Sequence, residues 1–225
     1  MGTRPVADPR GAPMTTAEPR RRYRSALREQ QAGQTRAAVV AAATVLFGEK
    51  GWAGTGMRDV ARAAGVAVET VYANFKSKTE LLTACVDAAV VADTEPVPLA
   101  QRPAIAELGR GPRAQRIAKT AHLVGDIHER TAGVLKALRE AAASDPELAR
   151  WRRDGEERRR ADIAHAAGLI AGREVTAEEC DSLWAVTSSE VHDLLTGLRG
   201  WSREQYEQWL NQALDRLLVI RSRSR

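Results

Sequence analysis

The sequence predicts an all-α protein. From Thr35 onward, apolar residues recur every three or four positions, which is the spacing of one face of a helix. No segment sustains the alternation of apolar and polar residues that a half-buried strand requires. Four expected helix starts also contain a capping box, in which Glu or Gln follows a hydroxyl residue by three positions. These pairs are Ser77 with Glu80, Ser144 with Glu147, Thr176 with Glu179, and Ser202 with Gln205.

The helices are expected between these starts and a set of glycine stops, among them Gly51, Gly172 and Gly200. The expected ranges are 35–49, 55–63, 67–73, 77–92, 103–109, 113–143, 146–171, 176–199 and 202–220. The sequence leaves open whether 113–143 is one helix or two helices that meet near Thr131–Gly133.

The charge is distributed unevenly along the 225 residues, whose net charge is +5. Residues 1–34 carry +4, residues 35–80 carry +2, residues 81–220 carry −4 and the last five residues carry +3. The basic front is compatible with an anionic partner such as DNA. The sequence contains neither a secretory signal nor the roughly 18–20 consecutive apolar residues of a membrane helix. Its two cysteines are too few for a disulfide scaffold or a metal cluster.

Four segments are expected from composition and pattern. Residues 1–32 form an arm rich in Arg and Pro, which predicts disorder. Residues 33–93 form a front helical domain, residues 94–220 form a rear helical domain, and residues 221–225 form a basic tail.

The front domain contains the pattern of a helix-turn-helix. Two short amphipathic helices are expected on either side of Gly65, and small Ala residues permit their close approach. The major groove of DNA is wide enough to accept the second helix of such a pair, while the first helix lies across the backbone.

The run from Gly51 to Leu82, GWAGTGMRDVARAAGVAVETVYANFKSKTELL, resembles the DNA-binding domain of the TetR family of bacterial transcriptional regulators. The shared elements are a Gly-aromatic loop, Thr before Arg-Asp-hydrophobic-Ala, Ala-Gly-Val, Thr-hydrophobic-Tyr, and Ser-Lys before Leu-Leu. The resemblance covers roughly residues 33–93. It implies a homodimer that binds double-stranded operator DNA through its recognition helices.

The resemblance also implies which residues contact DNA. Thr55 would cap the first motif helix and contact phosphate, while Tyr72 and Lys78 would each contact a phosphate. The full expected set is Thr55, Arg58, Val68, Glu69, Thr70, Tyr72, Asn74 and Lys78. Three positions depart from the family pattern: Ala67 lacks a capping hydroxyl, Glu69 places an acid toward DNA, and Gly56 replaces a frequent Thr.

The rear domain resembles the family more weakly. This resemblance implies that the rear domain contains a dimer interface and a small-molecule pocket. The expected interface residues are Leu183, Val191, Leu194, Leu198, Leu210, Leu214 and Leu217. The alternative is that these apolar stripes face only their own core. The candidate pocket residues are His122, Trp151 and Trp184, and each of them is also compatible with a core, interface or surface position.

The function expected from the resemblance is a sequence-specific regulator, most often a repressor, released from a palindromic operator by a small molecule. One alternative is a regulator that responds to no ligand. Another is a helical-bundle metal enzyme, which needs paired Glu-x-x-His units. Asp162 and His165 form the nearest single unit, and it has no twin. We therefore expect no catalytic residue, no metal, no cofactor and no membrane partner, and a bacterial cytoplasmic protein that associates with the nucleoid.

Overall fold

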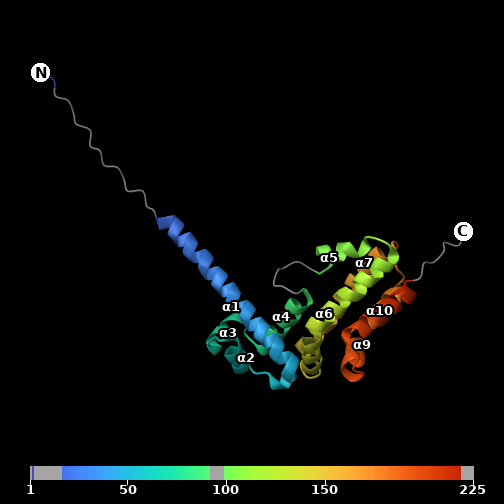
Figure 1. The fold of residues 1–225 in the computed structure, drawn as a ribbon. Coiled ribbons are helices and arrows are strands. Elements are labelled where there is room, and N and C mark those ends of the chain that lie inside the picture. Colours follow the sequence, from blue (N-terminus) through green and yellow to red (C-terminus); the bar gives the residue numbers. More distant parts are fainter. Residues whose placement is uncertain (1, 3–16, 92–98, 219–225) are drawn as a thin grey trace. The chain divides into compact units, whose positions relative to one another are not determined.

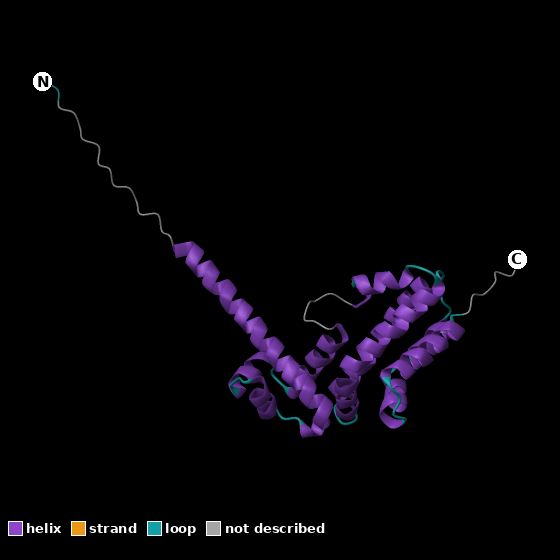
Figure 2. Ribbon diagram, viewed as in Figure 1, coloured by secondary structure: helices purple, strands orange, loops and turns teal. Residues whose placement is uncertain are grey.

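The computed structural model describes residue 2, residues 17–91 and residues 99–218, with side chains from residue 28 onward. All regular structure in these residues is helical, as the sequence predicts (Figure 2). Residues 1–37 and 38–225 form separate compact units. The basic tail, residues 221–225, and most of the first 16 residues of the arm lie outside the described part of the chain.

The first unit contains the beginning of α1 (Ala17–Gly54), which starts 18 residues before the expected start at residue 35. The sequence from Arg20 to Gln34 contains no proline and is rich in Arg, Glu, Gln and Ala, which have high helix propensity. An apolar face is not required to extend a helix that is already nucleated, because only nucleation is costly. At its other end α1 is interrupted at Gly51, as predicted, by a non-helical backbone with φ 67° and ψ −173°.

The front part of the second unit contains the rest of α1, α2 (Met57–Ala64), α3 (Val68–Asn74) and α4 (Lys78–Val91) (Figure 1). Their apolar faces share one core. Its most buried members include Val39, Ala43, Phe47, Val60, Val71, Phe75, Leu81, Leu82 and Cys85. The same core also contains residues of the next long helices, among them Val134, Leu138 and Leu148.

The rear part begins with three short elements, η1 (Leu99–Gln101), α5 (Pro103–Ala106) and η2 (Glu107–Gly109). Two long helices follow, α6 (Arg113–Ala142) and α7 (Pro146–Ala171). The last elements are α8 (Ala177–Val186), α9 (Ser189–His192), the π-helical segment η3 (Asp193–Leu198) and α10 (Arg203–Leu217). A second core lies among them and includes Ile117, Ile170, Leu183, Tyr206, Leu210 and Leu214.

The helix α6 is continuous, so the break considered near Thr131–Gly133 is absent from it. The helix expected over 176–199 is instead divided into α8, α9 and η3. The division occurs because Ser188 has extended backbone angles and its hydroxyl accepts the Val191 N–H, which starts a new helix.

Two of the capping boxes form as predicted, at Thr176 with Glu179 and at Ser202 with Gln205. The box at Ser77 is altered, because the Glu80 carboxylate accepts the N–H of Lys76. The prediction for Ser144 is wrong: Asp145, the residue directly before Pro146, caps α7 by accepting two backbone N–H groups. A carboxylate one residue closer to the first turn replaces the hydroxyl in this role.

Candidate nucleic-acid interface

The turn between α2 and α3 depends on Gly65. Its backbone is left-handed, with φ 67° and ψ 30°, a conformation that glycine adopts without steric cost. The N–H of Val66 then donates to the carbonyl of Ala61, which closes the end of α2. The next helix begins at Ala67 without a side-chain cap, as the sequence predicts. The two helices therefore form a helix-turn-helix.

The two faces of α3 differ in chemistry. Val71 and Phe75 are fully buried and Val68 packs against the same core. The outward stripe consists of Glu69, Tyr72 and Ala73, all exposed. Tyr72 and Ala73 follow Glu69 by three and four residues, so the three side chains lie on one side of the helix. Tyr72 is the large aromatic side chain of this stripe, and it is 52% exposed.

The other expected contacts on α2 and α3 are distributed less uniformly. Arg58 is exposed on α2 and is compatible with a contact to DNA. Val68 and Thr70 are half-buried, which leaves them less surface than the outward stripe. The Asn74 amide donates to the carbonyl of Thr70 at 2.8 Å, one turn earlier in the same helix.

Thr55 has a different role from the one expected. Its side chain is buried, and its hydroxyl is within hydrogen-bonding distance of the carbonyl oxygens of Leu46, at 3.0 Å, and Gly51, at 2.9 Å. The N-cap of α2 is Gly56, which has no side chain to offer. Thr55 therefore links the end of α1 to the start of the helix-turn-helix by hydrogen bonding. Its hydroxyl does not face outward toward a phosphate.

Lys78 is held by Trp52, a residue that was absent from the expected set. The Lys78 ammonium donates to the Trp52 carbonyl and lies 4.0 Å from the centre of the indole ring. Burial lowers the pKa of Lys78 from its usual value of 10.5. The aromatic residue of the Gly-aromatic loop was the available signal for this site, because an indole face attracts cations.

Glu140 was also missed. Its carboxylate accepts the backbone N–H of Trp52 at 3.0 Å, and it lies 88 positions further along the chain, on α6. No local pattern relates the two residues, so the contact was not visible in the sequence.

The comparisons with known proteins agree with this geometry. Residues 39–85 match the family model described as bacterial regulatory proteins, tetR family. This region contains the end of α1, the whole helix-turn-helix and the first half of α4. The match assigns this front region of the chain to the DNA-binding part of the TetR family.

Solved structures extend the TetR-family fold beyond the matched region. A TetR-family regulator from Mesorhizobium loti superposes with a TM-score of 0.62 at 20% identity, covering 83% of this chain and 96% of that chain. A transcriptional regulator from a Rhodococcus species gives a TM-score of 0.59 at 21% identity, with coverages of 81% and 95%. The multidrug binding protein EbrR in complex with ethidium gives a TM-score of 0.55 at 24% identity, covering 81% of this chain and 97% of that chain. No curated protein matches the sequence.

The expected dimer residues fall into two groups. Leu183, Leu210 and Leu214 are buried in the core of their own chain, as the alternative interpretation of these stripes expected. A fully buried side chain has no further surface to bury against a partner. Val191 and Leu217 are half-buried. Leu194 and Leu198, which are 54% and 75% exposed, keep an apolar surface for a partner.

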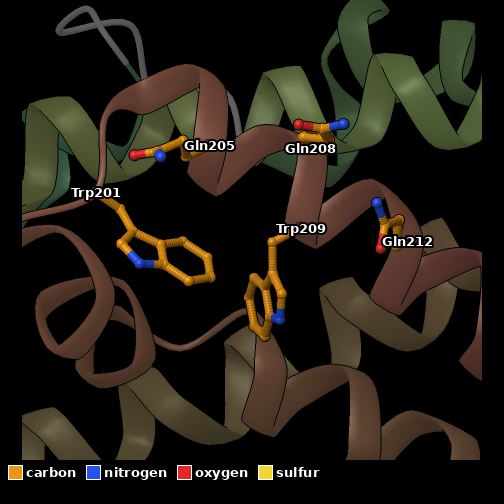
Figure 3. A pocket seen from close by; sticks show the side chains of 5 residues that line it. All are labelled: Trp201, Gln205, Gln208, Trp209 and Gln212. Carbon is orange, nitrogen blue, oxygen red and sulfur yellow. The ribbon is translucent and has the colours of Figure 1, made fainter. Parts of the chain in front are cut away.

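A hollow lies along α10, on the segment that follows η3 in the sequence. It is lined by Trp201, Gln205, Gln208, Trp209 and Gln212. Figure 3 shows the two indoles, whose rings are 6.3 Å apart and nearly perpendicular. The glutamines supply hydrogen-bonding groups along α10 beside these rings.

The three candidate pocket residues have different surroundings in the structure. His122 is exposed and lies beside Glu207, at 3.2 Å. Trp151 packs against the front core. Trp184 donates its indole N–H to Glu156 at 3.0 Å, and Arg159 lies over its ring.

The interior of the rear part instead contains a hydrogen-bonded histidine. His128 is buried between the hydroxyl of Tyr206, at 2.9 Å, and the carbonyl of Thr187, at 3.1 Å. Its ring lies 4.9 Å from that of His192, whose Nδ1 is buried without a hydrogen-bond partner. Burial lowers the pKa of both imidazoles.

The described part of the chain has no helix that combines the length and the apolar character needed to cross a membrane. The fold is that of TetR-family regulators, and residues 39–85 match the model of that family.

Proposed function

We propose that this TetR-family protein is a homodimeric repressor that binds a palindromic operator and is released by a small molecule. The observation that carries the proposal is the outward stripe of α3, where Tyr72 projects from a helix whose opposite face is fixed in the core. The stripe is short and narrow enough for a major groove. We also propose that the protein acts in the bacterial cytoplasm, associated with the nucleoid.

The proposed dimer rests on the exposed apolar side chains of η3 and on the adjoining indoles. Leu194 and Leu198 are large, apolar and mostly exposed, and Trp201 and Trp209 border the neighbouring hollow. Large apolar side chains that gather on a surface are typical of an interaction site. Two copies joined there would present two recognition helices to half-sites about 34–36 Å apart.

The proposed response to a small molecule is supported by the likeness to EbrR, a multidrug binding protein solved with ethidium and with imidazole. In this chain the effector would favour a conformer whose recognition helices are wrongly spaced for the operator. The affinity for DNA then falls by the difference in the effector's affinity for the two conformers.

Fluorescence anisotropy on the DNA upstream of the gene tests DNA binding directly. We expect the wild type to bind one sequence far more tightly than a scrambled control. The variant Tyr72→Ala should bind at least tenfold more weakly, while Tyr72→Phe separates the hydroxyl from the ring. A control is Gln115→Ala, at an exposed position of α6. No sequence-specific binding by the wild type, or full binding by Tyr72→Ala, would contradict the proposal.

A further inference from the structure

The front and rear parts of the second unit touch backbone to backbone at two glycines. An ideal Cβ on Gly133 of α6 would lie 2.6 Å from the Cα of Gly48 in α1. An ideal Cβ on Gly48 would lie 3.7 Å from the Cα of Gly133, which is an ordinary contact. The crossing is therefore asymmetric: it excludes any side chain at Gly133 and tolerates a methyl group at Gly48.

Glu140 makes a second contact, about two turns further along α6. Its carboxylate accepts the Trp52 N–H in the segment that joins α1 to α2. Gly51 has a φ of 67°, and an ideal Cβ there would lie 2.6 Å from the same carboxylate oxygen. The backbone conformation favours glycine, and a side chain at this position would displace the carboxylate of Glu140.

Trp52 connects Glu140 to the helices on both sides of the helix-turn-helix through its own contacts. Its ring stacks on Phe47 of α1, with centroids 6.1 Å apart, and lies beneath the ammonium of Lys78 at the start of α4. A shift of the Trp52 backbone therefore acts on the ends of both helices that flank the helix-turn-helix.

Between the two contacts, α6 is buried in the front core. Val134, Ala137 and Leu138 are each at most 2% exposed there. Arg139, the residue before Glu140, contacts the last helices of the rear part instead. It donates a hydrogen bond to the Ser189 hydroxyl at 2.8 Å and forms an ion pair with Asp193. Ser189 begins α9 and Asp193 begins η3, and η3 carries the exposed Leu194 and Leu198. One turn of α6 thus joins the DNA-binding helices to the proposed dimer surface.

We infer that Gly133 and Glu140 are positioning residues for DNA binding, which together set the separation of the two recognition helices in the dimer. This inference rests on the proposed function. Neither residue contacts DNA in this arrangement; both act through the placement of α1 and the Trp52 segment on α6. Closely packed elements cannot deform continuously, so a displacement at the crossing moves the helix-turn-helix as a body.

A positioning role and a purely structural role differ in what they change. Loss of packing alone lowers stability and reduces binding to every DNA by the same factor. A changed placement of the recognition helices instead alters the preferred spacing between half-sites. The preferred spacing is therefore the decisive measurement.

The first test compares Gly133→Ala with Gly48→Ala. Both replace a helical glycine by the residue with the highest helix propensity, so propensity alone favours both helices equally. The probe is DNA selected from a random pool by the wild-type protein, remade with spacers one or two base pairs longer and shorter. We expect Gly48→Ala to keep the wild-type preference. We expect the affinity of Gly133→Ala for DNA with the selected spacer to fall at least tenfold. Its affinity for DNA with another spacer should fall by less.

The second test removes the carboxylate. Glu140→Ala leaves the Trp52 N–H without its acceptor, whereas the side-chain oxygen of Glu140→Gln can still accept it. We expect Glu140→Ala to change the spacer preference and to speed hydrogen exchange of the amide of Trp52, and Glu140→Gln to restore both. The comparison of Glu140→Ala with Glu140→Gln tests the positioning role even if Gly133→Ala does not fold.

The outcomes separate the inference from the proposed function. A wild type that selects no sequence from the pool would overturn the proposed function and this inference with it. A wild type that selects an operator, with Gly133→Ala and Glu140→Ala both keeping its spacer preference, would overturn the inference alone. Uniform weakening on all spacers would also overturn it, because that result assigns the residues to packing.

Discussion

At the scale of single residues, burial decides what a side chain can do. Thr55 shows this most clearly, since the family resemblance implies a phosphate contact and the structure gives its hydroxyl two carbonyl partners in α1. The sequence identified the right residue type at the right place but not its direction, because a hydroxyl suits a phosphate and a carbonyl equally well.

Replacing Thr55 with Val tests that assignment. The variant keeps the shape and removes the donor, so we expect the free energy of unfolding to fall by about 1–3 kcal/mol, measured by urea denaturation. The control Thr83→Val, on a half-buried helical position, should change it by no more than about 0.5 kcal/mol. Weaker DNA binding by Thr55→Val with unchanged stability would instead support the phosphate contact.

His128 gives an expected pH dependence at the same scale. Burial, aided by His192, lowers the pKa of His128 from 6.5 to about 3. Its contribution to stability is therefore present above pH 6.5 and is lost as the pH falls toward 3, because only the unfolded chain takes up the proton. The slope approaches about 1.4 kcal/mol per pH unit below pH 6.5.

The measurement is urea denaturation of wild type and His128→Gln between pH 7.5 and 5. We expect the wild type to lose stability more steeply on acidification than the variant does. The control His165→Gln, at an exposed position, should follow the wild type. Equal slopes for wild type and His128→Gln would show that folding does not lower the pKa of this imidazole.

At the scale of elements, helix starts follow local chemistry where a hydroxyl or carboxylate is present. The recognition helix α3 is the exception, since Ala67 is its N-cap, with φ −69° and ψ 149° and no side-chain cap. The helix is held instead by Val71 and Phe75 in the core. Tertiary packing therefore compensates for a weak start.

Ala67→Ser is expected to supply the missing cap. Its hydroxyl can accept a free N–H of the first turn, so the free energy of unfolding should rise by about 1 kcal/mol, measured by thermal and urea denaturation. The same change at exposed Ala73, inside the helix, should lower it by up to about 0.5 kcal/mol. A loss of stability in Ala67→Ser would exclude capping at this position.

At the scale of the whole molecule, the exposed leucines of η3 determine the expected assembly. We expect light scattering of the wild type to give about twice the 24.5 kDa of one chain. Leu198→Glu should shift the protein toward the monomer, because a carboxylate would have to be buried without a partner. The control Val45→Glu, at a residue 56% exposed on α1, should remain dimeric. A wild-type monomer, or a dimer of undiminished stability in Leu198→Glu, would contradict the proposed interface.

The sequence by itself determined the all-helical class, the position of the helix-turn-helix, two complete capping boxes and the stop at Gly51. Each of these depends on residues within a few positions of one another, where periodicity and capping chemistry are direct. Only the tertiary structure decided the buried direction of Thr55, the division of the helix after Val186, and the burial of Leu183, Leu210 and Leu214 in their own chain. It alone brought Gly133 to Gly48 and Glu140 to Trp52. Contacts between residues 85 or more positions apart depend on how whole helices pack, and no local pattern encodes that packing.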